Sequence, residues 1–189
     1  MSSDASVFLA GRLLVATPQI EEGTFRRAVL LLLHHDEDGA QGVILNRPLD
    51  ADIDSVLPGW QSVATRPATL FQGGPVELNS AIGLVTIPGD QHETLGVKQL
   101  FGGLGLLDLD APPGLVAAEV AGMRIFAGYA GWSGGQLEAE IRRGDWYVVE
   151  SEARDAFTTD PQLLWSGVLA RQRDNLKLVA SFPDDPTLN

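Results

Sequence analysis

Apolar runs separated by turn signals divide this chain into short strands and helices. Residues 27–35 form a nearly continuous apolar run, Asp36 to Gly39 ends in an Asp-Gly pair, and residues 42–45 are apolar again. This order predicts a hairpin of two strands. The unbroken leucines predict that its first strand is covered on both faces.

Strand patterns dominate the first half of the chain, and helices alternate with strands in the second half. Further strands are expected at residues 12–17, 68–72, 81–87, 123–129, 146–149 and 176–179, and a loop at 89–96. Helices are expected at residues 52–63, 115–121, 136–143 and 160–171, the second ending at Gly122 and the third at Gly144. We therefore predict an α+β fold with a mixed sheet, in one domain over residues 1–189 that leaves room for a small second lobe in the middle.

Composition narrows the classes of function. The 189 residues carry a formal net charge of -12, which disfavours binding to nucleic acids and to anionic membranes. The chain has no cysteine, which excludes disulfides, thiolate zinc sites and a cysteine nucleophile. Residues 1–6 lack the pattern of a signal peptide, and the longest apolar run, residues 28–33, is far shorter than the roughly 20 residues that span a bilayer. We expect a cytoplasmic protein without a membrane partner.

A serine motif is the first candidate for chemistry. Gly131, Ser133 and Gly135 have the spacing of a nucleophile elbow between a predicted strand and a predicted helix. A hydrolase of that class needs a histidine after the serine, whereas all three histidines precede Ser133. The favoured interpretation is a capping box, in which the Ser133 hydroxyl accepts a bond from the Gln136 amide and the Gln136 side chain reaches back.

Histidines, glycines and basic residues are the other candidates. His34 and His35 are neighbours on a strand and so point to opposite faces; we predict that one is buried and the other exposed, and we predict no metal. The glycines at residues 73–74 and 102–105 lack the spacing of nucleotide-binding loops and favour turns or close packing, so no cofactor is predicted. The basic residues Arg171, Arg173 and Lys177 fit the end of a helix, and direct binding of nucleic acid is disfavoured.

Five motifs together resemble the AlgH/YqgE family of bacterial proteins. They are residues 9–18 (LAGRLLVATP), 25–29 (FRRAV), 39–48 (GAQGVILNRP), 71–76 (FQGGPV) and 128–141 (GYAGWSGGQLEAEI), followed by Trp146. The resemblance covers nearly the whole chain, although Asp36 stands where such families commonly have asparagine. It implies a strongly curved, branched, pseudo-barrel-like mixed sheet flanked by helices. It implies no established enzyme activity, and some members are described as transcriptional regulators without a recognised DNA-binding module.

Polar and aromatic residues of these motifs suggest a ligand-binding groove. Glycines allow a ligand close to the backbone, aromatic rings supply a flat wall, and amides and arginines supply directional hydrogen bonds. The residues predicted to converge on this groove are Arg27, Asn46, Gln72, Gly73, Gly74, Tyr129, Trp132 and Gln136. The competing interpretation is that they tie strand ends together and that Trp132 belongs to the core.

Two classes of function remain open, and no catalytic residue can be assigned. We expect a non-catalytic interaction or regulatory protein, because no pair of nucleophile and base can be assembled. The alternative is a small-molecule-binding protein, or an enzyme of unknown reaction, with its groove near Trp132. A transcriptional regulator that binds DNA directly is the least favoured interpretation.

Overall fold

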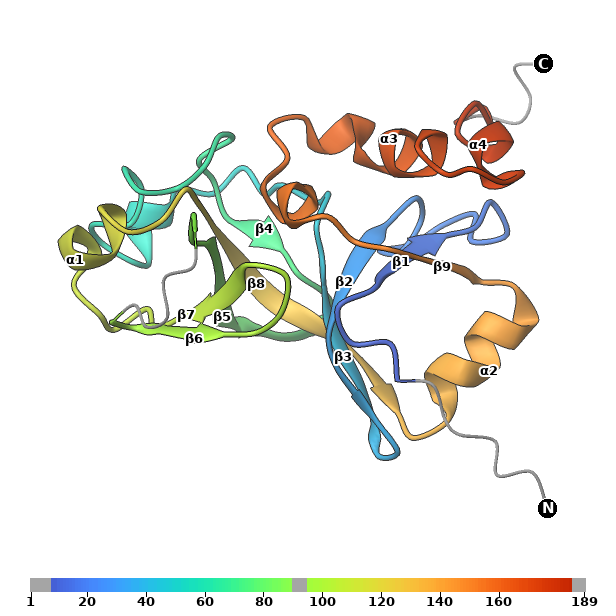
Figure 1. Ribbon diagram of the computed structural model, residues 1–189, viewed down its shortest axis with the longest axis horizontal. Coiled ribbons are helices and arrows are strands. Elements are labelled where there is room, and N and C mark those ends of the chain that lie inside the picture. Colours follow the sequence, from blue (N-terminus) through green and yellow to red (C-terminus); the bar gives the residue numbers. More distant parts are fainter. Residues whose placement is uncertain (1–7, 90–94, 185–189) are drawn as a thin grey trace.

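The structure is a computed structural model that describes residues 8–89 and 95–184. Within these residues, nine strands make one sheet that curls into a half-barrel (Figure 1). The strands are β1 (Leu13–Ala16), β2 (Val29–Asp36), β3 (Gly39–Ile44), β4 (Phe71–Gln72), β5 (Val76–Thr86), β6 (Val97–Gln99), β7 (Leu104–Leu107), β8 (Gly122–Ser133) and β9 (Trp146–Val149). The helices are α1 (Pro113–Ala117), α2 (Gln136–Arg143), α3 (Leu164–Ala170) and α4 (Leu176–Val179), with short 3₁₀ turns at Ile53–Ser55, Ala153–Phe157 and Pro161–Leu163.

The sheet confirms the α+β class and is branched at β8. The strand order is β6-β7-β5-β8-β3-β2-β1-β9, with neighbours antiparallel. β4 pairs with β8 in parallel, which makes the sheet mixed. The end of β8 pairs with β3 (Gly42 opposite Ala130), while its first half pairs with β5. Where β3 and β8 part, Gly73 fills the gap, because its amide donates to Ala127 and its carbonyl accepts from Ile44, both at 2.8 Å.

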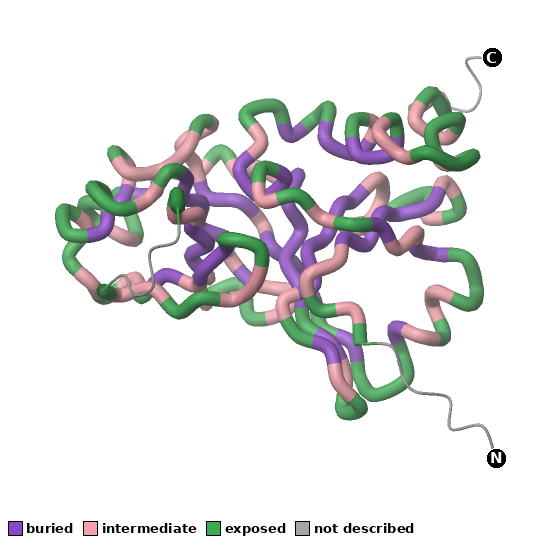
Figure 2. Tube along the Cα trace, viewed as in Figure 1, coloured by how far each residue is buried: buried purple, intermediate pink, exposed green. Residues whose placement is uncertain are grey.

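The predicted hairpin is present, and the apolar run of β2 is buried on both faces. Val29 and Leu31 pack in the cluster that includes residues of α3, whereas Leu30 and Leu32 pack in the cluster that includes Leu137 of α2. The buried segments concentrate where the strands cross (Figure 2). The strand therefore serves two hydrophobic layers, as its unbroken leucines predict.

Two predictions fail in the middle of the chain. The helix expected at residues 52–63 is reduced to the 3₁₀ turn Ile53–Ser55, because Pro58 and Gly59, with φ of 94°, break it. The helix expected at 115–121 starts earlier and ends at Ala117, and Gly122 begins β8 instead of ending the helix. The elements of residues 50–120 gather at one end of the molecule (Figure 1), and a separate lobe there stays a prediction.

The end of the chain differs as well. Residues 176–179, expected as a strand, form the helix α4, which starts where the Asp174 carboxylate accepts a bond from the Leu176 amide at 3.0 Å. By contrast, α2 ends at Gly144 and β9 spans Trp146–Val149, as predicted. Most of the loop expected at 89–96 lies outside the described residues. Across the part that is described, no helix has the length and apolar character needed to cross a membrane.

Candidate functional site

The eight residues predicted to share one groove do not converge. Arg27 and Asn46 border a cavity of about 400 Å³ beside α3, whereas Tyr129 and Trp132 border a different one of about 440 Å³ near the tip of the β2–β3 hairpin. Gln72, Gly73, Gly74 and Gln136 border neither of these two cavities. The reason is the length of β3: Asn46 follows its end, while Trp132 pairs with Ala40 near its start. At about 3.3 Å per residue, the strand keeps the two groups apart.

Several of these residues instead hold the fold together. Asn46 is buried, accepts a bond from the Val29 amide at 3.0 Å and donates to the Arg27 carbonyl at 2.9 Å. Trp132 is only 7% exposed and packs edge-on against Trp146, as the core interpretation predicts. A role in binding a ligand stays a prediction for these side chains.

Ser133 is engaged with a group that cannot act as a base. Its amide and its hydroxyl both donate to Gln136 Oε1, at 3.0 and 3.2 Å. Half of the predicted capping box is therefore present, but Gly135, with φ of 79°, occupies the N-cap position that was expected for Ser133. An amide oxygen does not deprotonate a hydroxyl, so the structure gives the nucleophile reading no support.

The histidine pair divides between surface and core, as predicted. His34 is exposed and lies 2.6 Å from the Asp36 carboxylate, whereas the His35 side chain is 1% exposed. His35 Nδ1 accepts a bond from the Leu9 amide at 2.9 Å, so the ring carries its proton on Nε2 and donates it to Glu138. Both ring nitrogens are occupied, which leaves neither for a metal. His92 lies outside the described residues, and within them no three His, Asp or Glu side chains cluster as metal ligands.

Glu138 ties α2 to the hairpin through His35 and makes stability depend on pH. Partial burial raises the pKa of its carboxyl, but bonds from its own backbone amide and from His35, with the charge of Arg142, outweigh burial and lower it. A carboxyl with a lowered folded-state pKa stabilises the fold above its unfolded-state pKa near 4.5, and this contribution is lost as the pH falls through the folded-state value.

We therefore expect Glu138→Gln to lower the free energy of unfolding at pH 7 by up to about 1 kcal/mol, because the side chain is 38% exposed. The difference from wild type should vanish in acid. Urea unfolding at pH 7 and at a pH below the lowered folded-state pKa of Glu138 measures it, with the exposed Glu119→Gln as the matched control. A Glu138→Gln deficit that persists unchanged in acid would contradict a stabilising role of the ionised carboxylate.

A cluster of arginines beside α3 is the most distinctive polar site among the described residues. Arg26 and Arg27 end the loop between β1 and β2, and Arg47 follows β3. The antiparallel pairing brings the end of β1, the start of β2 and the end of β3 side by side, at the same end of these strands. Trp165 of α3 lies against these strand ends, where its indole donates to the Ala16 carbonyl at 2.9 Å. We call Arg26, Arg27, Arg47 and Trp165 the arginine pocket.

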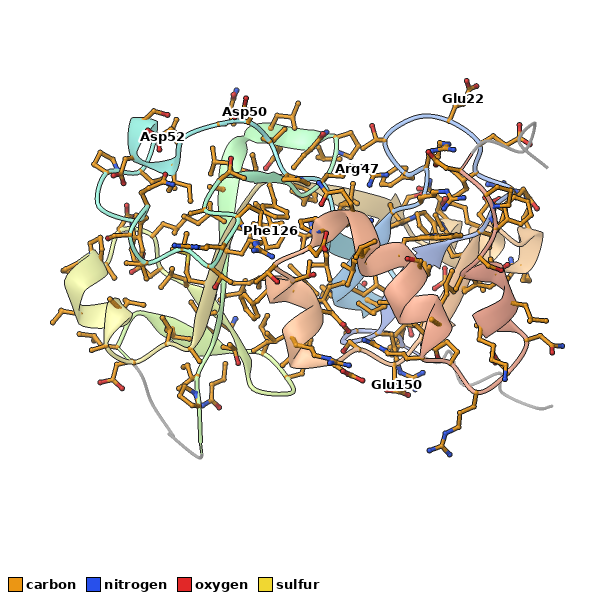
Figure 3. The ribbon with its side chains drawn as sticks, turned by 90° about the horizontal axis from the view of Figure 1, so that it is seen from above. Glu22, Arg47, Asp50, Asp52, Phe126 and Glu150 are labelled. Atoms are coloured by element: carbon orange, nitrogen blue, oxygen red, sulfur yellow. The ribbon has the colours of Figure 1, made fainter. Side chains whose placement is uncertain are left out.

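Two guanidinium groups of the arginine pocket meet at one carboxylate. Asp184 Oδ1 lies 2.8 Å from Arg26 Nη1 and 3.2 Å from Arg27 Nε. The Arg27 guanidinium also stacks on the Trp165 ring, 4.3 Å from its centroid. Cavities of about 290 and 400 Å³ flank the pair, and Arg47 borders the larger one beside the start of α3 (Figure 3). The arrangement brings a carboxylate and two guanidinium groups together beside an aromatic ring.

The electrostatics of the arginine pocket favour an acidic ligand. Burial lowers the pKa of Arg27, Asp184 acts in the opposite direction, and the neighbouring Arg26 lowers it further. Burial and the charge of Arg26 also lower the pKa of Arg47. Guanidinium groups stay charged nonetheless. Arg47 makes no ion pair with any described carboxylate and donates to the backbone carbonyls of Arg26 and Asn46. Asp184 thus pairs with two of the three guanidinium groups, and Glu21 borders the smaller cavity beside them.

The backbone at Arg27 is held in a conformation that non-glycine residues rarely adopt. Its φ is 53°, in the left-handed region. The turn closes with a bond from the Ala28 amide to the Phe25 carbonyl at 3.0 Å, and Asn46 holds the Arg27 carbonyl. Strained residues of this kind cluster at binding sites. Asn46 therefore helps to hold the backbone of Arg27 in this conformation.

Sequence reasoning found part of this site and missed the rest. It selected Arg27 and Asn46, but not Arg26, Trp165 or Asp184. The adjacent arginines before β2 were a usable signal, because two neighbouring cations in an acidic chain indicate a site for an anion. Trp165 and Asp184 gave no such signal, since they lie more than a hundred residues away in sequence.

Comparisons with known proteins place the chain in a family. The family described as AlgH-like (DUF179) matches residues 13–177. A UPF0301 protein of Streptomyces avermitilis is 53% identical over 184 residues, covering 96% of this chain and 95% of the relative. The crystal structure of protein DIP2367 from Corynebacterium diphtheriae superposes with a TM-score of 0.85 at 33% identity, over 96% and 95% of the two chains. The solution structure of the AlgH protein from Pseudomonas aeruginosa follows with a TM-score of 0.68 at 27% identity, over 97% and 98%. The chain therefore belongs to the AlgH-like family, whose UPF0301 relatives carry names that state no function.

Proposed function

We propose that this protein is a non-catalytic binding protein of the cytoplasm that recognises a carboxylate-bearing or similarly anionic group at the arginine pocket. The observation that carries the proposal is the meeting of Arg26 and Arg27 on a single carboxylate oxygen of Asp184. Guanidinium groups arranged in this way recognise anions with directional, charge-assisted bonds. The carboxylate of Asp184 stands where the anion of a ligand would bind.

Binding is favoured over catalysis by the groups that line the pocket. The residues that border its cavities include three arginines and no histidine. Of the two carboxylates there, Asp184 is engaged in ion pairs, and Glu21 has no neighbouring nucleophile or histidine to act with. Direct DNA binding is the weaker alternative. Arg171, from the basic cluster of the last helices, is held by both oxygens of Asp155 at 2.6 and 2.7 Å. The net charge of -12 also repels a phosphate backbone.

Titration with small anions tests the proposal. Succinate and inorganic phosphate, added to the full chain, should shift the NMR signals of the Arg26 and Arg27 side chains at millimolar concentration. In the double variant Arg26→Gln with Arg27→Gln, followed by its backbone amide signals because the arginine signals are lost, affinity should fall at least about tenfold, since each charged hydrogen bond contributes about 1.5–3 kcal/mol.

The control for this titration is Arg173→Gln, which removes one exposed arginine that does not border the pocket's cavities. It should bind both anions as the wild type does. The proposal fails if neither anion moves the Arg26 and Arg27 signals, or if Arg173→Gln weakens binding as much as the double variant.

A further inference from the structure

The end of the described chain lies in the arginine pocket. Phe182, Pro183 and Asp184 border the cavity of about 290 Å³ together with Arg26 and Arg27. The pocket is therefore occupied by a segment of polypeptide that brings an aromatic ring, a proline and a carboxylate.

The arginines contact the backbone of this segment as well as its carboxylate. Arg27 Nη2 donates to the carbonyl of Phe182 at 2.7 Å, and Arg26 Nη2 donates to the carbonyl of Asp184. Each guanidinium thus binds one peptide carbonyl in addition to the Asp184 side chain. A phosphate ion or a small dicarboxylate offers no carbonyls at this spacing. The pattern of donors fits a polypeptide better than a small anion.

We infer that the partner recognised at the arginine pocket is an acidic polypeptide segment of another protein, with an apolar residue two positions before an aspartate, and that the chain's own residues 182–184 occupy the pocket as a competitor. This inference rests on the proposed function of the arginine pocket and names its ligand. Arginine clusters that bind acidic motifs are a recurring mode of peptide recognition. The competing segment keeps the site closed until a better ligand displaces it.

The internal segment is held in a way that permits exchange. Asp184 is 77% exposed and Phe182 is 45% exposed, so neither is locked into the core. Exposed ion pairs hold only weakly. A segment tethered to its own site acts at an effective concentration on the order of millimolar, which an external ligand has to overcome. Removing the charge of Asp184 should therefore open the pocket.

Binding of a peptide in trans tests the inference. The probe is the acetylated, fluorescently labelled peptide Ser-Phe-Pro-Asp-Asp amide, which copies residues 181–185, and fluorescence anisotropy measures its affinity. The full-length Asp184→Asn variant should bind it at least about tenfold more tightly than wild type. Asp52→Asn is the matched control: it removes the same charge at an exposed residue whose side chain makes no cap bond and which lies away from Arg47 (Figure 3). Asp52→Asn should bind the probe as wild type does.

Two further measurements distinguish a failure of the peptide inference from a failure of the proposed anion-binding function. The first compares three other ligands with the probe on the Asp184→Asn variant: succinate, inorganic phosphate, and the same peptide with asparagine in place of both aspartates. Each should bind at least about tenfold more weakly than the probe. If the small anions bind as tightly as the peptide, the pocket is an anion site and the peptide inference is overturned. If Asp184→Asn binds the peptide no better than Asp52→Asn does, residues 182–184 are not a competitor and the inference is overturned too. If nothing binds to Asp184→Asn, the proposed function fails with it.

Discussion

Replacing Arg124 with alanine is expected to lower the free energy of unfolding by about 3 kcal/mol or more, since it leaves several backbone carbonyls without their bonds, at about 1–3 kcal/mol for each one that stays buried. Arg124 lies on β8, is 1% exposed, and has its pKa lowered by burial to about 10. Nη1 donates to the carbonyls of Ala156 and Thr158 at 3.2 and 2.8 Å, and Nη2 donates to that of Arg66 at 2.8 Å. The guanidinium also stacks on Phe71 at 4.2 Å from the ring centroid.

Urea unfolding measures this effect, with Arg173→Ala as the control. Arg173 is exposed, so its replacement should change stability by less than about 0.5 kcal/mol. Arg124 Nε has no hydrogen-bond partner, which means that the network is not perfectly satisfied. A loss below about 1 kcal/mol for Arg124→Ala would show that these carbonyls find water or each other, and that the arginine does not hold the turns to the sheet.

Arg124 also illustrates where sequence reasoning stops. The apolar run around it predicted a strand at residues 123–129, and β8 is there. Nothing in that run showed that the one charged side chain points inward, because its acceptors are 32 to 59 residues away. Local patterns of apolar residues predicted the hairpin, α2 and β9 because each depends on neighbours in sequence. The placement of Gly73 between β3 and β8 depends on three segments that are distant in sequence, so no local pattern predicts it.

The same limit explains the candidate site. Chemistry alone grouped Arg27 with Tyr129 and Trp132, since arginine and aromatic rings suit a ligand together. The structure separates them by the length of β3 and gives Arg27 a different aromatic partner, Trp165. That partner arrives with α3, and Asp184 arrives with the end of the chain. The residue types of a binding site were predictable from the sequence, whereas their grouping required the fold.

Gly74→Ala is the second variant expected to destabilise strongly, by about 3 kcal/mol or more. A Cβ at this position would lie 2.1 Å from the carbonyl carbon of Tyr129 and 2.4 Å from the amide of Ala130. Both atoms belong to the backbone of β8, so no side chain can turn away and the strand itself would have to move. Gly73 is equally confined, with a Cβ position 2.3 Å from the carbonyl oxygen of Gly128.

Gly167→Ala is the matched control for the same chemical change. A Cβ at Gly167 meets no atom within 4 Å, and the residue lies inside α3, where alanine is favoured over glycine by about 0.5–1 kcal/mol. Urea unfolding of the two variants should therefore move in opposite directions. If Gly74→Ala were as stable as wild type, the segment after β4 would be loose, and Gly73 and Gly74 would regain the room beside the backbone that a ligand needs. A large loss means that these glycines are required because strands pack there, and the search for the ligand belongs at the arginine pocket.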